Sequence, residues 1–471
     1  MSLADSRHEP GSDRSHVSLI NSLPAELLSS IFEWYMFPSD PASFADYLPG
    51  EPLTVSHVCK LWRETALDLP FMWRRIFVKT CQNEGRYLLA QLFLKRTKDQ
   101  TIAICYAERL CSKDHQGEPC TAAIKFVIRN IGQTHTLMLE YINGTTLSCL
   151  SKIPGDAASR LSCLVATVNH REQVFPPVTM QAALSPLYRV PSLRNLDWGL
   201  PTTLEKDIPW GQLTRVEMTT SIDVKDFLHI LAGGKALLSI RLYLEESPRQ
   251  MDEAAQVSTA RYAPVENVTL REMDLECDGP QDDLFRALRL PNLKRLALSP
   301  LSESDGMRVL FNDFQVFSDF LCRVRGGLQE FALDYAHDQL EDRVRIQIFG
   351  LPRMSTLLNL RIRETAGGAG DDFFKALTID SRGSAPLLPR LTSLRTSACT
   401  TTDGVISRML QSRHTHRYPL RNIFLGYPCG TAVPQPRDAA AYDTLSAMGW
   451  EIGIEELPMP FSWSDQESVW E

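Results

Sequence analysis

The sequence predicts an α/β chain in which a small all-α unit is followed by a long solenoid of strand–helix repeats. Two observations predict this fold class. Residues 20–76 hold short amphipathic helical segments with a heavy load of aromatic and aliphatic side chains. From residue 190 onward, a six-residue pattern of apolar positions returns every 20 to 35 residues. One unit and one array then account for the 471 residues, where length alone would suggest about three domains.

The first helix is predicted to begin near Leu23, after a polar, Ser-rich stretch over residues 1–18 that we expect to be disordered. Ser22 can cap this helix, and Pro24 sits in its first turn, where a missing N–H costs nothing. A loop rich in turn-forming residues is predicted over 38–52, and a second helix over 54–66. The apolar residues at helical spacing are Leu27, Leu28, Ile31 and Phe32 in the first helix and Val55, Val58, Cys59, Trp62 and Ala66 in the second.

These two segments also carry a resemblance to a known family. The strings LPAELLSSIF and LTVSHVCKLWRETALDLPFMWRRI resemble the F-box of fungal F-box-like proteins, over roughly 55 residues within 19–75. The loop over 38–52 is longer than the short F-box consensus. The resemblance implies a surface for Skp1, the adaptor that connects F-box proteins to a cullin complex in a ubiquitin ligase. The Skp1-binding residues that it implies are Leu23, Pro24, Leu27, Leu28, Ile31, Val55, Val58, Cys59 and Trp62. For Val58, Cys59 and Trp62 individually, a role in the unit's own core is an alternative.

The remainder of the chain is read as a repeat. Strands are predicted around apolar triplets that begin at residues 193, 213, 237, 265, 293, 328, 357, 391 and 420, with amphipathic helices between them. The spacing is near that of leucine-rich repeats, although the usual asparagine is mostly missing. We therefore expect a degenerate leucine-rich-repeat-like solenoid over 76–457, with fainter units before residue 190. We expect an acidic tail over 458–471. The C-terminal segment has two alternative roles, capping of the array or docking of a partner.

Charge on the strands suggests how the solenoid could bind. Residues between the inward apolar positions should face the concave surface, and there seven arginines outnumber four acids. Arginine favours bidentate capture of carboxylate or phosphate, so an acidic or phosphorylated target segment is one hypothesis, and a solvated face with incidental charge is the other. The arginines assigned to the target are Arg241, Arg271, Arg295, Arg361, Arg363 and Arg395.

Composition and charge exclude several classes of protein. The chain carries 49 Lys and Arg against 57 Asp and Glu, a net charge of -8, which disfavours a globally basic nucleic-acid binder. No apolar run reaches the roughly 18 residues of a membrane span, and the polar N-terminus does not resemble a secretion signal. The eleven cysteines form no close CxxC pair, so we expect reduced thiols. The prediction is a cytoplasmic or nuclear protein that binds neither nucleic acid nor membrane.

The sequence contains little evidence of a catalytic motif. The glycines at 367, 368 and 370 precede an aspartate that would repel phosphate, so they are read as a loop before a helix. His414 and His416 have no carboxylate or thiol at metal-ligand spacing. We therefore expect no catalytic, cofactor-binding or metal-binding residues. The leading hypothesis is a substrate-recognition adaptor of a Skp1–cullin–F-box ubiquitin ligase. Its alternatives are a repeat scaffold that recruits no ligase and an enzyme whose site is assembled only in space.

Overall fold

The structure is a computed structural model, and two compact units divide it, Met1–Tyr141 and Ile142–Glu471. Each unit is described by itself. The predicted disordered tail over 1–18, most of the predicted loop over 38–52 and the acidic tail over 458–471 lie outside the described residues. The residues that the structure describes are 23–36, 51–79, 84–108, 121–168, 177–200, 208–245, 262–300, 310–335, 342–364, 368–379, 386–397, 399–428 and 435–457.

The N-terminal unit opens with three helices, α1 (Ala25–Met36), α2 (Glu51–Ser56) and α3 (Lys60–Asp68). The single helix predicted over 54–66 is wrong, because the chain breaks between Ser56 and Lys60 and α2 starts inside the predicted loop. Cys59 causes the restart. Its backbone is extended, and its sulfur accepts the Trp62 N–H at 3.5 Å, so Cys59 is the N-cap of α3.

The helices pack on one another through aromatic side chains. Phe32 of α1 and Trp62 of α3 meet edge to face with ring centroids 5.0 Å apart. Trp73, in the 3₁₀ turn Pro70–Trp73, is fully buried and donates its indole N–H to the carbonyl of Ala66 at 2.8 Å. This turn leads directly into the first strand, which begins at Arg75.

The rest of the N-terminal unit is a short parallel sheet with two helices. Strand β1 (Arg75–Lys79) pairs with β2 (Ile102–Ala107), and β2 pairs with β3 (Thr134–Ile142). Helices α4 (Glu84–Thr97) and α5 (Thr121–Asn130) connect them. The faint repeat units predicted around Ile102 and Leu137 are therefore confirmed as strands.

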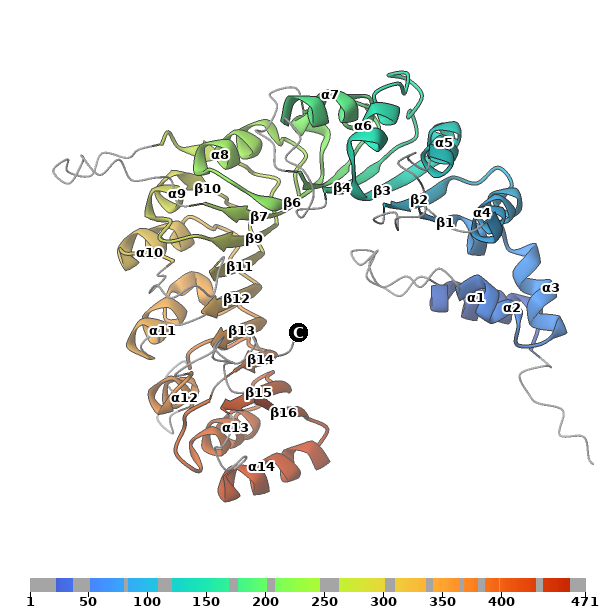
Figure 1. The fold of residues 1–471 in the computed structure, drawn as a ribbon. Coiled ribbons are helices and arrows are strands. Elements are labelled where there is room, and N and C mark those ends of the chain that lie inside the picture. Colours follow the sequence, from blue (N-terminus) through green and yellow to red (C-terminus); the bar gives the residue numbers. More distant parts are fainter. Residues whose placement is uncertain are drawn as a thin grey trace, which may run out of the picture. The chain divides into compact units, whose positions relative to one another are not determined.

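The C-terminal unit is a parallel sheet whose strands follow one another in sequence order, with helices along one side (Figure 1). Burial alternates along most strands, as on β7 and β9, so one row of side chains enters the core and the next row faces outward. The strands of this sheet are β4 (Cys163–Val168), β5 (Asn195–Gly199), β6 (Arg215–Ile222), β7 (Ser239–Leu244), β9 (Glu272–Cys277), β11 (Arg295–Pro300), β12 (Glu330–Tyr335), β13 (Asn359–Glu364), β14 (Ser393–Thr396), β15 (Asn422–Pro428) and β16 (Glu451–Leu457).

The helices of this unit present apolar faces to the inward row of the strands, as a repeat architecture requires. In register, that row runs through residues such as Leu296, Phe331, Leu360 and Leu394, all at most 2% exposed. The helices are α6 (Gly144–Leu150), α7 (Pro177–Tyr188), α8 (Val224–Gly233), α9 (Asp282–Ala287), α10 (Phe314–Cys322), α11 (Asp342–Phe349), α12 (Asp371–Leu377), α13 (Val405–Thr415) and α14 (Pro436–Ala447). The predicted mixed α/β class, with a repeat-like solenoid of parallel strands, is confirmed.

Eight of the nine predicted strand motifs lie on strands of the main parallel sheet. The motif that begins at residue 265 does not. There the short β8 (Val265–Glu266) pairs with β10 (Leu288–Arg289) in a separate two-stranded sheet. The main-sheet strand is β9, whose inward residues Met273 and Leu275 continue the same apolar spacing from Leu270. The sequence contains two overlapping matches to the pattern, beginning at residues 265 and 270, and the second one forms the strand.

Aspartates connect successive repeats. Asp371, the first residue of α12, accepts both the backbone N–H and the hydroxyl of Thr402 in the next repeat, each at 2.7 Å. Asp282 and Asp403 reach the backbone N–H groups before or within the first turn of the following helix in the same way. Asp282 and Asp371 also lie in the first turn of their own helices, α9 and α12, so each connects two successive repeats.

Two arginines donate hydrogen bonds to backbone carbonyls near the C-terminal ends of helices. Arg413 of α13 is fully buried and donates to three carbonyls of the preceding repeat, those of Leu377 at 3.0 Å, Leu388 at 3.2 Å and Leu387 at 2.5 Å. Burial lowers the pKa of Arg413 to about 10. Arg323, after α10, donates to the carbonyls of Phe285 and Leu288 in the same manner. These bonds satisfy carbonyls at the ends of α9 and α12 and in the segment before β14.

Candidate binding surfaces

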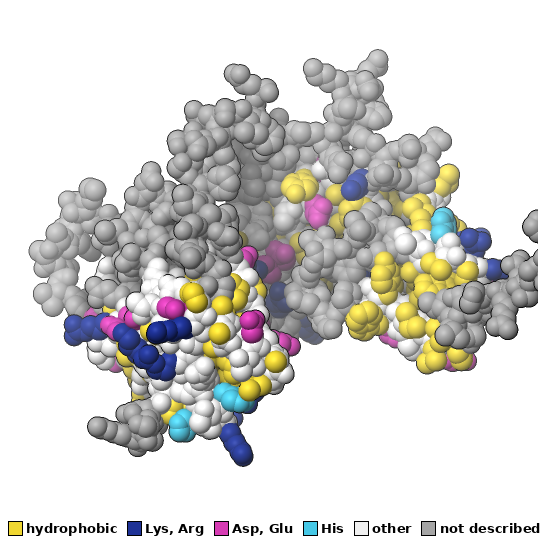
Figure 2. All heavy atoms as spheres, turned by 90° about the horizontal axis from the view of Figure 1, so that it is seen from below, with side chains coloured by type: hydrophobic (Ala, Val, Ile, Leu, Met, Phe, Trp, Pro, Cys, Tyr) yellow, Lys and Arg dark blue, Asp and Glu magenta, His cyan; other side chains and the backbone are white. Residues whose placement is uncertain are grey.

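The first candidate surface is an exposed apolar face on the helices of the N-terminal unit. Leu27, Ile31, Trp34 and Tyr35 recur on one side of α1 and are 52%, 43%, 76% and 47% exposed. Val58, in the break between α2 and α3, is 56% exposed. A view from below shows hydrophobic side chains gathered on this unit (Figure 2). We call these five residues the α1 face.

The residues expected to bind Skp1 divide into exposed and buried groups. Pro24, Leu27, Ile31 and Val58 are exposed, and Leu23, Cys59 and Trp62 are half-buried. Leu28 and Val55 are buried in the unit's own core and reach a partner only through the helices that they support. The resemblance did not mark Trp34 and Tyr35, although their spacing after Leu27 could have revealed them.

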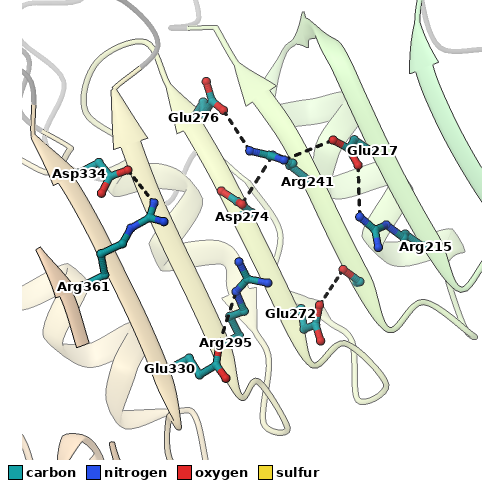
Figure 3. A network of polar contacts seen from close by, with 11 residues as sticks. Arg215, Glu217, Arg241, Glu272, Asp274, Glu276, Arg295, Glu330, Asp334 and Arg361 are labelled. Atoms are coloured by element: carbon teal, nitrogen blue, oxygen red, sulfur yellow. Dashed lines mark hydrogen bonds and ion pairs between the residues drawn. The ribbon is translucent and has the colours of Figure 1, made fainter. Parts of the chain in front are cut away.

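The second candidate surface is the strand face, which we define as the outward residues of β5 to β16. Arg241 on β7 lies between carboxylates from both neighbouring strands, 3.5 Å from Glu217, 3.6 Å from Asp274 and 3.9 Å from Glu276 (Figure 3). Burial alone would lower the pKa of Arg241, but these carboxylates outweigh it and raise the pKa. Arg241 is therefore neutralised within the fold.

Acids predominate at this end of the strand face. Burial, followed by the neighbouring Glu217, raises the pKa of Asp197 on β5 to about 6, and one of its carboxylate oxygens is buried without a hydrogen bond among the described residues. Burial likewise raises the pKa of Asp274 and Glu276 against the pull of Arg241. The outward charged residues of β5 to β9 are Asp197, Glu217, Glu272, Asp274 and Glu276 with Arg215 and Arg241, a net charge of -3.

Arginines predominate on β13 and β14. Arg361 and Arg363 on β13 and Arg395 on β14 are exposed, and Arg361 pairs with Asp334 at 2.9 Å. Arg295 on β11 lies apart from them, 3.8 Å from Glu330. Arg271 precedes β9 and is not on a strand, because the predicted register there was wrong. With the acids of β9 and with Glu451 and Glu455 of β16 added, the predicted overall arginine surplus disappears. Acids predominate on β5 to β9, and arginines are concentrated on β13 and β14.

Other chemistry is sparse among the residues that the structure describes. They contain no group of three or more His, Cys, Asp and Glu that could hold a metal ion, and no helix long and apolar enough to cross a membrane. The seven cysteines in the described ranges form no disulfide with one another. His414, considered above as a ligand, lies beside the Trp450 ring at 6.0 Å between centroids.

Comparisons with known proteins characterise the N-terminal unit. The F-box-like family model matches residues 20–79, so this unit contains an F-box-like domain. Among solved structures, the chain is similar to a protein from Bacteroides fragilis, with 12% identity, 73% of this chain and 81% of that chain covered, and a TM-score of 0.31. It is also similar to a TLR13–ssRNA13 complex, with 14% identity, coverage of 78% and 59%, and a TM-score of 0.27. No curated protein sequence matches the chain.

Proposed function

We propose that this chain is the substrate-recognition adaptor of a Skp1–cullin–F-box ubiquitin ligase. The F-box-like domain binds a Skp1-type adaptor, and the solenoid holds a target protein on its strand face. The chain itself supplies no catalytic group, because holding the target near a ubiquitin-conjugating enzyme provides the proximity that the reaction needs. The family match over 20–79, coupled with the exposed α1 face inside it, carries the proposal.

The exposure of the α1 face supports a partner of apolar chemistry. A soluble unit gains nothing from leaving a tryptophan and two aliphatic side chains in water on one side of a single helix. Burying Leu27, Ile31 and Val58 against a partner would contribute roughly 1–2 kcal/mol each. The inward residues Leu28 and Phe32 are at most 1% exposed, so α1 already has its own core face and the outward face is available.

Co-purification tests the proposal. We expect the full chain, co-expressed with a Skp1-type adaptor, to elute with it at one-to-one stoichiometry. The triple variant Leu27→Ser/Ile31→Ser/Val58→Ser should lose the complex while keeping its thermal unfolding midpoint, because all three side chains are exposed. The matched control is Leu238→Ser/Val268→Ser/Met448→Ser, which removes three exposed apolar side chains from the solenoid and should bind as the unmodified chain does.

The rival readings predict different outcomes. If the unmodified chain does not bind the adaptor, the ligase role is wrong and the repeat scaffold is the better account. If the control variant loses the complex and the α1 variant keeps it, the adaptor binds elsewhere and the α1 face has another role.

A further inference from the structure

The part of the strand face formed by β13 and β14 is built differently from the acidic part formed by β5 to β9. Strand pairing places Arg361, Arg395, Phe424 and Gly453 in one row across β13, β14, β15 and β16. Neighbours in such a row lie about 4.8 Å apart, and Arg363 lies about 6.6 Å further along β13 on the same face. Three arginines therefore stand on neighbouring positions of two adjacent strands, with Arg361 turned toward Asp334 on β12 and Arg395 toward Phe424 on β15. We call Arg361, Arg363, Arg395 and Phe424 the arginine patch.

Phe424 holds Arg395 in place. The Arg395 guanidinium lies over the Phe424 ring, 4.3 Å from its centroid. The ring in turn lies on the backbone of Gly453, where a Cβ would stand 2.5 Å from a ring carbon. Glycine at 453 thus makes room for the aromatic platform. A stacked guanidinium keeps its N–H edge available for hydrogen bonds and loses less conformational entropy when an anion binds.

Few acids compete for these arginines. Asp334 pairs with Arg361 and leaves its second oxygen without a hydrogen bond among the described residues. Neither Arg363 nor Arg395 has an ion pair or side-chain hydrogen bond within the described part of the chain. Three arginines and one aspartate give the patch a net charge of +2, whereas Arg241 alone faces three carboxylates.

We propose that the arginine patch binds an extended peptide segment of the target that carries anionic side chains two residues apart. Alternate side chains of an extended peptide are separated by about 6.6 Å, which matches the separation of Arg361 and Arg363 along β13. Carboxylates and phosphates both suit guanidinium forks, so Asp or Glu residues and phosphorylated Ser or Thr are two sources of one chemistry. A long polyanion fits less well, because it would run onto the acids of β5 to β9.

This inference deepens the proposed function, since it names the chemistry of the target, but its test does not involve Skp1. Fluorescence anisotropy of the full chain would use labelled ten-residue Gly/Ser peptides with two Glu, two phosphoserines or two Lys at positions i and i+2. We expect one or both anionic peptides to bind and the Lys peptide not to bind. Binding of the phosphoserine peptide alone identifies a phosphorylated target, and binding of both identifies an acidic one.

Matched variants locate the site. Arg363→Ala/Arg395→Ala should weaken binding of the anionic peptide more than tenfold, since each lost contact is a charge-assisted hydrogen bond. Arg215→Ala/Arg241→Ala removes the same charge about 24 Å away, beyond the Debye length of about 10 Å, and should change binding less than twofold. Phe424→Leu keeps the charge but removes the stack, and should weaken binding about three- to fivefold.

The proposal is overturned if neither anionic peptide binds, if both arginine pairs matter equally, or if a labelled oligothymidylate binds in their place. Arg241, Arg363 and Arg395 are exposed and Arg215 is half-buried, and unchanged thermal unfolding midpoints would show that the variants are folded. If the peptides do not bind, the chain should still co-purify with the Skp1-type adaptor. If the α1 variant loses the adaptor, it should still bind the anionic peptide.

Discussion

The two units use their apolar residues in opposite ways. Nine of the thirteen large apolar side chains that are exposed among the described residues belong to the N-terminal unit, although it is less than half the length of the other. The solenoid instead buries its apolar rows between strands and helices and shows charges on its strand face. We infer that the first unit recognises an apolar partner and the second a charged one. Substitutions should therefore affect stability and binding separately in the two units.

The largest effect on stability should come from a buried polar residue of the solenoid. Arg413→Ala would leave the carbonyls of Leu377 and Leu387 without a donor among the described residues and would remove one of the two donors to the Leu388 carbonyl, so we expect it to destabilise the fold by about 3–5 kcal/mol. Denaturant unfolding measures this directly. Arg408→Ala, at an exposed position of the same helix, should stay within about 0.5 kcal/mol of the unmodified chain. Equal stability of the two variants would show that the hydrogen bonds of Arg413 do not stabilise the contact between repeats.

A smaller loss is expected at the aspartates that join repeats. Asp371→Ala removes the cap on Thr402 and should cost about 1–2 kcal/mol, whereas Asp372→Ala, at a 75% exposed side chain, should cost little. Burial tends to raise the pKa of Asp371, but the hydrogen bonds from Thr402 and Lys375 outweigh it and lower the pKa. Its contribution is therefore present above its unfolded pKa, so the cost should be the same at pH 7.5 and pH 5.5. A cost that halves at pH 5.5 would contradict this.

Asp197 should show the reverse behaviour. Because its pKa is raised to about 6 from an unfolded value of 3.8, its protonated form stabilises the fold below about pH 4, and this contribution is lost as pH rises through 6. Asp197→Asn should therefore raise the unfolding midpoint by about 2–4 °C at pH 7.5 and leave it unchanged at pH 4.5. Differential scanning calorimetry at the two pH values checks this, with Asp372→Asn as the exposed control. A midpoint that falls at pH 7.5 would mean that Asp197 forms a favourable ion pair.

The sequence predicted the architecture better than the surfaces. Eight strand motifs were placed correctly, because apolar spacing reports directly which side chains enter the core. At β9, two overlapping matches separated by five residues were equally apolar, and only strand pairing selects Met273 and Leu275. Because of that error, Asp274 and Glu276 were not expected on the strand face, and the sequence did not predict that they neutralise Arg241.

Other features could not be read from spacing at all. The stack of Arg395 on Phe424 depends on Gly453, which is 29 residues further along the chain, and only strand register brings the three together. The break at Cys59 was missed because the residues on either side keep helical spacing. The residues that match the F-box pattern do not reveal which of them face water, since Leu27 and Leu28 are neighbours with opposite burial.

The affinity of the full chain for a Skp1-type adaptor tests the central claim most directly. Calorimetric titration should give a one-to-one complex whose dissociation constant rises more than a hundredfold in Leu27→Ser/Ile31→Ser/Val58→Ser, since roughly 3 kcal/mol or more of apolar burial is lost. The unfolding midpoint of this variant should not change. Absence of binding by the unmodified chain, or equal affinity of the variant, would contradict the account.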